Sequence, residues 1–257
     1  MAAHSARGNG DAIDVTVYDG NDKVASHSGP ADQPMVFTVS DPKLWSPDSP
    51  NLYNVTVRLG DDEVHSYTGF RTFSKATIDG IVRPLLNGEF IFMFGTLDQG
   101  YWPDGIYTPP NREAMVYDLE VLKDLGFNMV RKHVSVNQFG YSNVCVNLTL
   151  LQIKVEPALF YRACDEMGLV VIQDMPALRP LQSQTSSDCS STTVLPDAQQ
   201  QEEFSRQLEV MVEQLKSHPS ISTWVSLPAP VSTVCAFANC PLGDLQRRLG
   251  SNIRLLP

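Results

Sequence analysis

Six side chains that could bind a polar ligand stand at or just after the ends of three expected strands. They are Asp98, Trp102 and Asp104 after the first strand, Arg131 and His133 at the second, and Asp174 at the third. In parallel α/β folds the carboxyl ends of the strands meet at one edge, where binding groups gather. Carboxylates accept hydrogen bonds from hydroxyl groups, and an indole offers a flat face for stacking. These residue types are therefore candidates for binding a small hydroxylated ligand.

Each candidate also has a structural interpretation. The first three residues could merely order a long loop, and the other three could hold the mouth of the fold together as a salt-bridge network. Glu156, Asp165 and Glu166 belong to an expected helical segment. We interpret these three as solvated or capping charges, because carboxylates are rarely buried without a partner.

Composition and charge argue against several other classes of function. The chain of 257 residues has a formal net charge of −10, and its Lys and Arg residues form no basic stripe, so we expect no nucleic-acid partner. No apolar run reaches membrane-spanning length, and residues 1–11 lack the apolar core of a signal peptide, which predicts a cytoplasmic chain without membrane contact. The five cysteines include no CxxC pair, so we expect no metal site.

The region from about 11 to 75 has the pattern of short strands. Alternating or apolar runs predict strands at about 13–17, 35–39, 52–59 and 64–67, separated by turn residues. This spacing is typical of a β-sandwich. Because the region carries its own alternating core, we expect it to fold without the rest of the chain.

From about residue 76 to 225 strands and helices alternate. Strands are expected at 90–94, 127–131, 169–173 and 221–225, and the helices between them begin at Asn111, Pro157 and about Gln199. Such alternation predicts a parallel sheet, either doubly wound or a (β/α)₈ barrel, of which four units make one half. Residues 134–153 and 226–257 follow neither period, so we expect an insert and an aberrant tail.

Several motifs, each weak alone, together resemble glycoside hydrolase family 2 in their order and spacing. LWSPDSPNLY at 44–53 and GFRTF at 69–73 resemble the end of that family's immunoglobulin-like domain, and LNGE at 86–89 resembles the start of its catalytic barrel. A subgroup described as β-galactosidase-like or β-glucuronidase-like is similar at four further motifs. These are LDQGYWPDGIYT at 97–108, GFNMVRKH at 126–133, QDMP at 173–176 and SHPSI at 217–221.

The resemblance implies an immunoglobulin-like β-sandwich at 11–75, followed by the first half of a TIM-type barrel at 76–225 with an insert at 134–153. It also implies hydrolysis of O-glycosyl bonds of β-linked sugars with retention, without a cofactor. Under this resemblance the six candidate side chains become sugar-binding residues.

The resemblance does not extend to the catalytic carboxylates of the family. Retaining glycosidases need two carboxyl groups about 5–5.5 Å apart. In the family the acid/base Glu follows the fourth strand in an Asn-Glu pair, whereas residues 224–230 here read WVSLPAP and no Glu follows Glu213. We therefore assign no catalytic residue and expect this chain to be inactive. Non-catalytic sugar binding and a non-functional translation product are the alternatives.

Val-Ser occurs at 134–135 and at 225–226, where the two aperiodic stretches start, and the codons of a common intron start can encode this dipeptide. Removing 134–152 would join RKH at 131–133 to IKVEP at 153–157, as the subgroup reads. In the tail, a one-base frame shift from Gly243 can be decoded to include FNEGWGQ, the missing acid/base motif. We therefore expect a truncated family member with two retained-intron segments. The sugar, its linkage and the oligomeric state stay open.

Overall fold

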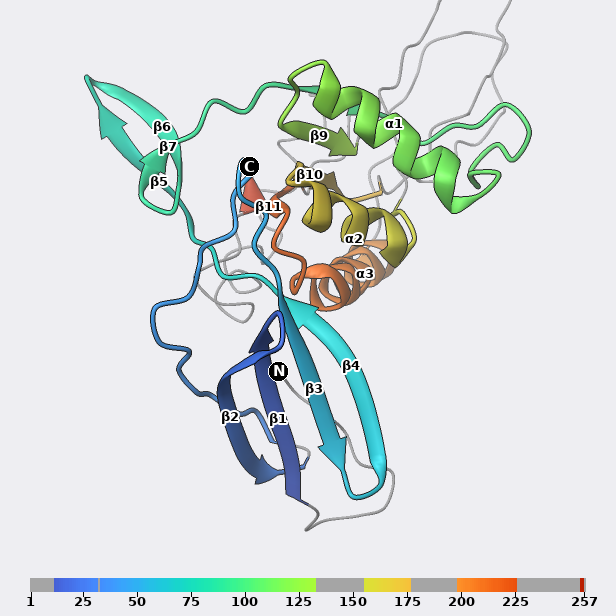
Figure 1. Ribbon diagram of the computed structural model, residues 1–257. Helices are drawn as coiled ribbons and strands as arrows, with labels where there is room; N and C mark the ends of the chain where they lie inside the picture. Colours follow the sequence, from blue (N-terminus) through green and yellow to red (C-terminus); the bar gives the residue numbers. More distant parts are fainter. Residues whose placement is uncertain (1–11, 32, 133–154, 177–197, 226–254, 257) are drawn as a thin grey trace, which may run out of the picture. The chain divides into compact units, whose positions relative to one another are not determined.

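The computed structural model describes residues 12–31, 33–132, 155–176, 198–225 and 255–256 (Figure 1). The expected insert, the tail up to 254 and His133 lie outside the described residues. The chain divides into two compact units. The first runs to Ile91 and also includes Asp165–Gly168 and Ser217–Pro219, and the second contains the remainder.

The first unit contains a four-stranded antiparallel sheet. Its strands are β1 (Ala12–Asp19), β2 (Asp22–Pro30), β3 (Tyr53–Leu59) and β4 (Asp62–Thr68), in the order β2-β1-β3-β4. Alternate residues of β1 and β3 point inward and form a core of Val15, Val17, Tyr53 and Val55. The alternating patterns therefore predicted β1, β3 and β4 correctly.

The strand expected at 35–39 is wrong. Residues 34–39 form no strand, and β1 instead pairs with β2, which the pattern did not predict. Met35 and Phe37 still pack against the core cluster, and the Phe37 ring stacks on His27 with 5.6 Å between centroids. An apolar run thus contacts the core here through side chains alone, without a neighbouring backbone to complete a ladder.

A second, three-stranded antiparallel sheet ends the continuous part of the first unit. It consists of β5 (Phe73–Ile78), β6 (Ile81–Leu86) and β7 (Glu89–Phe90). Two-residue turns at Asp79-Gly80 and Asn87-Gly88 join the strands, with positive φ at all four residues, as type I′ hairpins require. The immunoglobulin-like topology expected for this region stays a prediction.

The second unit is built on a parallel sheet. Its strands are β8 (Gly95–Asp98), β9 (Met129–Lys132), β10 (Val170–Asp174), β11 (Ile221–Val225) and β12 (Leu255–Leu256), in the order β12-β11-β10-β9-β8. Three helices lie between these strands in the sequence: α1 (Arg112–Asp124), α2 (Ala158–Met167) and α3 (Ala198–Leu215). This is the strand-helix alternation of a partial barrel. The sequence predicted β9, β10 and β11, but not β8 at its observed position or the short β12.

The first strand of this sheet begins later than the sequence predicted. Residues 91–94 form no strand, and β8 starts at Gly95. The side chain of Asn128 supplies the physical reason. Its Oδ1 accepts from the Phe94 backbone N–H at 2.8 Å, and its Nδ2 donates to the Phe92 carbonyl at 2.9 Å. A side chain therefore takes up the backbone groups that a strand would have paired.

Local signals fixed the helix ends as predicted. Asn111 caps α1, and its Oδ1 accepts from the Ala114 backbone N–H at 2.8 Å. Gly126 follows α1 and Gly168 follows α2, with φ of 85° and 72°. Glycine is favoured at this position because the left-handed conformation carries no Cβ penalty there.

The first unit is completed by residues far along the chain. Trp45 is fully buried, and its Nε1 donates to the Asp165 backbone carbonyl at 2.8 Å. The Tyr67 hydroxyl donates to Asp165 Oδ2 at 2.7 Å, and His218 Nδ1 pairs with the same oxygen at 2.6 Å. Asp165 is completely buried, so its interpretation as a solvated or capping charge is wrong.

Arg71 extends this cluster. Its Nε donates to the Pro219 carbonyl at 3.0 Å. Burial lowers the pKa of the Arg71 guanidinium, and the negative charge of Asp165 partly opposes that shift. Since Trp45, Tyr67 and Arg71 all use partners beyond residue 164, the expectation that residues 11–75 fold alone is not supported by their contacts.

Candidate functional site

The register of the parallel strands defines two faces of the sheet in the second unit. Neighbours directly paired in parallel strands share a face. Asp98, Lys132 and Gln173 are paired in this way and share one face. Leu97, Arg131 and Ile172 share the other, and Asp174, two residues along β10, lies on that face as well.

Helix α2 covers the first of these faces. The Lys132 ammonium lies over the Phe160 ring at 4.9 Å from its centroid, and the Tyr161 hydroxyl donates to Gln173 Oε1 at 2.7 Å. Arg131 and Asp174 therefore lie on the face opposite α2. In a closed barrel that face is the interior, and its carboxyl end is the mouth where substrates bind.

Arg131 and Asp174 form a bidentate ion pair across β9 and β10. Nε of Arg131 donates to Oδ1 at 3.1 Å, and Nη2 donates to Oδ2 at 3.0 Å. The aspartate side chain is 3% exposed and the arginine 37%, so the pair is anchored on one side and open on the other. Nη1 of Arg131 has no hydrogen-bond partner among the described residues. The structure thus brings together two of the six predicted residues.

Behind this pair lies a buried network that the sequence pattern did not single out. Lys132 is 1% exposed, and its Nζ lies 2.7 Å from Glu156 Oε1 and 3.0 Å from Asp98 Oδ2. Glu156 is itself buried, so its interpretation as a solvated or capping charge is wrong. Its placement follows from Lys132, because a buried charge is stable only with a partner. The alternation of β9, in which Arg131 and Lys132 face opposite sides, was the available signal.

Tyr161 and Gln173 extend this network to the backbone carbonyl of Asp174. The Glu156 backbone N–H donates to the Tyr161 hydroxyl at 3.1 Å, and the Gln173 amide donates to the Asp174 carbonyl at 2.9 Å. Burial is the main cause that raises the pKa of the Tyr161 phenol far above its ordinary value. The phenol therefore stays neutral and can both accept and donate.

The loop after β8 contains the other predicted residues. Asp98 Oδ1 accepts from the Gly100 backbone N–H at 2.8 Å while Oδ2 pairs with Lys132, so its carboxylate fixes the start of the loop. Trp102 and Ile106 exchange two backbone hydrogen bonds, of 2.9 and 3.0 Å, around an exposed turn that contains Asp104. Among the described residues, neither Trp102 nor Asp104 makes a hydrogen bond or ion pair with Arg131 or Asp174.

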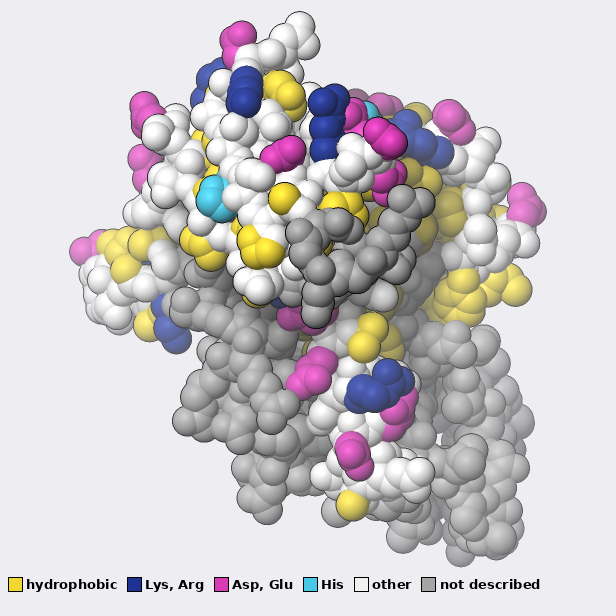
Figure 2. Space-filling view, turned by 90° about the horizontal axis from the view of Figure 1, so that it is seen from below, with side chains coloured by type: hydrophobic (Ala, Val, Ile, Leu, Met, Phe, Trp, Pro, Cys, Tyr) yellow, Lys and Arg dark blue, Asp and Glu magenta, His cyan; other side chains and the backbone are white. Residues whose placement is uncertain are grey.

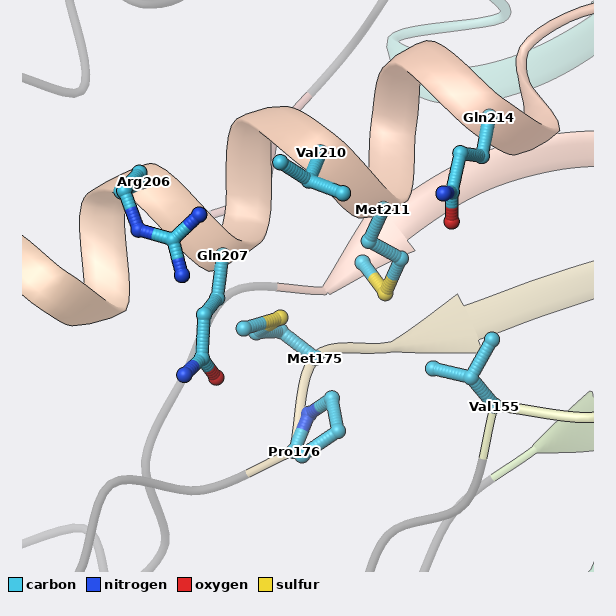
Figure 3. A pocket seen from close by; sticks show the side chains of 8 residues that line it. All are labelled: Val155, Met175, Pro176, Arg206, Gln207, Val210, Met211 and Gln214. Atoms are coloured by element: carbon cyan, nitrogen blue, oxygen red, sulfur yellow. The ribbon is translucent and has the colours of Figure 1, made fainter.

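An apolar hollow of about 240 Å³ lies between the end of β10 and α3. Figure 3 shows Met175 and Pro176 facing the helix, with Arg206 and Gln214 at opposite ends of the lining segment of α3. None of the six predicted residues lines it. We therefore place the candidate site at the Arg131–Asp174 pair and not in this hollow.

The described part of the chain offers neither a metal-binding cluster nor a membrane-spanning helix. Within the described ranges, no group of three His, Cys, Asp or Glu side chains could hold a metal ion. No helix of the described part is long and apolar enough to cross a bilayer.

On the face drawn in Figure 2, acidic and basic side chains are interspersed over the described residues, without the basic stripe that nucleic-acid binding needs.

The sequence resembles several known proteins. Residues 6–71 match the family model of glycosyl hydrolases family 2. A protein of Formosa agariphila that carries the name β-glucuronidase is 34% identical over 173 residues, which is 63% of this chain and 14% of that protein. Residues 6–71 therefore belong to a glycosyl hydrolase family 2 domain. A β-galactosidase of Psychromonas ingrahamii is 27% identical over 73% of the chain and 16% of its own length.

Solved structures of family 2 enzymes share the fold. The β-galacturonidase of Eisenbergiella tayi, solved with galacturonate, matches with a TM-score of 0.69 at 21% identity, over 98% of this chain and 41% of that one. The β-glucuronidase of Parabacteroides merdae matches with a TM-score of 0.67 at 21% identity, over 95% and 29%. These likenesses show a shared fold, and the chain spans less than half the length of these relatives.

Proposed function

We propose that this chain supplies one wall of a family 2 β-glycosidase site and binds a β-linked hexose or the corresponding uronic acid. The Arg131–Asp174 pair carries the proposal. It stands at the carboxyl ends of adjacent parallel strands, on the face opposite α2, with an open guanidinium edge. Active sites of β/α barrels form at this end of the strands.

The pair is suited to hydroxyl recognition. Asp174 holds the guanidinium plane through two hydrogen bonds, so the arginine loses little further freedom when it donates to a ligand. The buried network behind the pair fixes the backbone of both strands. Trp102, Asp104 and His133 are proposed as further sugar contacts from their positions after β8 and β9. Asp98, whose carboxylate is held by Lys132 and Gly100, is proposed to act by shaping the loop.

The reaction proposed for the complete site is hydrolysis of an O-glycosyl bond with retention. Relatives named β-glucuronidase and β-galactosidase support this reaction class. The mechanism requires an acid/base and a nucleophilic carboxylate, yet residues 214–257 contain no Glu. We therefore propose that this chain binds the sugar without turning it over.

The test is a calorimetric titration of the purified chain with galactose, glucuronate and galacturonate. We expect one of these sugars to bind, and Asp174→Asn to weaken that binding at least tenfold. Glu203→Gln is the matched control, because Glu203 also forms a bidentate pair, with Arg206, but on the exposed surface of α3. No binding of any of the three, or equal effects of the two variants, would refute the proposal.

A turnover assay with 4-nitrophenyl β-glucuronide and β-galactoside completes the test. The expected result is no release of nitrophenol. Turnover that disappears on substitution of a residue between 85 and 224 would overturn the proposed inactivity, while leaving the binding proposal intact.

A further inference from the structure

We infer that Tyr101 and Tyr107 form a separate subsite that stacks on a second sugar ring of the ligand. This inference rests on the proposed function, and it adds the length of the ligand. The two rings lie 5.3 Å apart with 41° between their planes, and their hydroxyls are 3.4 Å apart. Neither tyrosine was a site candidate from its position in the sequence.

The two rings are held together by the backbone between them. Trp102 and Ile106 form an antiparallel bridge with two reciprocal hydrogen bonds. Tyr101 and Tyr107 are the next residues outward, so they form the adjacent cross-strand pair. Side chains alternate along paired strands, which places the two tyrosines on the opposite face from Trp102 and Ile106.

The backbone of the turn that closes this hairpin is strained, and the side chain of Ile106 is not buried in a core that would offset the strain. Ile106 has a φ of 55°, which is unfavourable for a β-branched residue, and it is 61% exposed. A Cβ on Gly105 would overlap the carbonyl oxygen of Thr108, so only glycine fits there. Strain that no core contact repays is typical of ligand-binding segments. Here the strained turn holds the rings of Tyr101 and Tyr107 side by side.

The chemistry of the pair fits a sugar ring. Tyr101 is 42% exposed, so ring surface is available to a ligand. The hydrogen bond with Tyr107 is the largest of the causes that raise the pKa of the Tyr101 phenol, so the hydroxyl stays protonated. An aromatic face with adjacent hydroxyls matches a pyranose, which has apolar C–H faces and a polar rim.

Its position fits a second ring and not the first. Tyr101 stands three residues after Asp98, a reach of at most about 11 Å along the chain. Asp98 is itself fixed to β9 through Lys132 and to the loop through Gly100. The tyrosine pair lies in the loop that follows the carboxyl end of β8, the strand next to β9. The inference assigns the second sugar ring to this loop and the first to Arg131–Asp174.

The experiment compares a monosaccharide with a disaccharide. The probes are the monosaccharide that binds in the titration above and the β-linked disaccharide in which it is the non-reducing ring. We expect Tyr107→Ala to weaken the disaccharide about three- to tenfold, as the loss of one aromatic contact predicts. Monosaccharide binding should be unchanged. Tyr107→Phe retains the ring and should stay within about twofold of the natural chain.

Tyr117→Ala is the matched control, because Tyr117 is 63% exposed and lies on α1, outside the Trp102–Ile106 hairpin. It should change neither affinity. The inference alone is overturned if the disaccharide binds no more tightly than the monosaccharide, or if Tyr107→Ala weakens both equally. If none of the sugars binds, the proposed function and this inference fall together.

Discussion

Two glycines that end helices offer a matched test of what holds the first unit together. Gly126 and Gly168 both follow a helix and both have positive φ, of 85° and 72°. A Cβ added at Gly126 would meet nothing within 4 Å. A Cβ added at Gly168 would overlap the carbonyl oxygen of Pro47 and lie 2.9 Å from its Cα. The two sites therefore share the backbone strain and differ in the packing.

The expected losses in the free energy of unfolding follow from the backbone strain and from the packing. A non-glycine residue in the left-handed region costs about 1–2 kcal/mol, partly offset by about 0.4–1 kcal/mol from the less flexible unfolded chain. We expect Gly126→Ala to lower the free energy of unfolding by about 1 kcal/mol. Gly168→Ala should cost a further ~1–3 kcal/mol, because overpacking adds to the strain. For a chain of this size the extra loss lowers Tm by about 2–4 °C per kcal/mol.

Urea denaturation of the natural chain and both variants, followed by far-ultraviolet circular dichroism, measures the difference. Because the atoms of Pro47 that would be struck belong to its backbone, Pro47→Ala should not rescue Gly168→Ala. Equal losses in the two glycine variants, within about 0.5 kcal/mol, would show that Gly168 is not packed against Pro47 in solution, and the reasoning would be wrong.

Three further predictions concern buried polar groups. Asp165→Ala removes the common acceptor of two side chains and should cost about 3–5 kcal/mol in urea unfolding, whereas Tyr67→Phe, which removes only the hydroxyl that contacts Asp165 and His218, should cost about 1–2 kcal/mol. Lys132→Met leaves a buried carboxylate unpaired and should cost a similar ~3–5 kcal/mol, of which adding Glu156→Gln should restore a part; an additive double variant would contradict the pairing. Because burial raises the folded-state pKa of Tyr161 above its unfolded value, its contribution is complete below about pH 10 and is lost as the pH rises further. Unfolding measured between pH 8 and 11 should show this loss, and Tyr161→Phe should remove it.

Local signals made much of the fold predictable. The apolar run at 221–225 became β11 without change, and Asn111, Gly126 and Gly168 mark helix ends as their residue types imply. The runs at 35–39 and 90–94 failed, because an apolar run does not show whether a neighbouring backbone is available to pair with it. In the second case the decisive group was the side chain of Asn128, more than thirty residues away.

The candidate site was predictable only in part. Arg131 and Asp174 could be placed at the ends of neighbouring strands from spacing, and the structure joins them. Lys132 and Glu156 are separated by 24 residues, and Asp165 lies 98 residues after Tyr67, so no local pattern shows that these charges are buried and paired. The burial of a charge depends on its partner, and that partner is set by the tertiary fold.

The distant partners of Trp45 and Tyr67 have a consequence for synthesis of the chain. Trp45 can form its hydrogen bond only after a residue 120 positions later has been synthesised. Tyr67 can contact His218 only after a further 151 residues have been added. At about 5–20 residues per second, the first of these delays is roughly 6–24 s. During that time the strands β1–β4 are complete in sequence but an indole and a phenol still lack their acceptors. The first unit can therefore be completed only after the ribosome has passed residue 219, and we expect substitutions at 165–168 or 217–219 to lower the yield of the folded first unit.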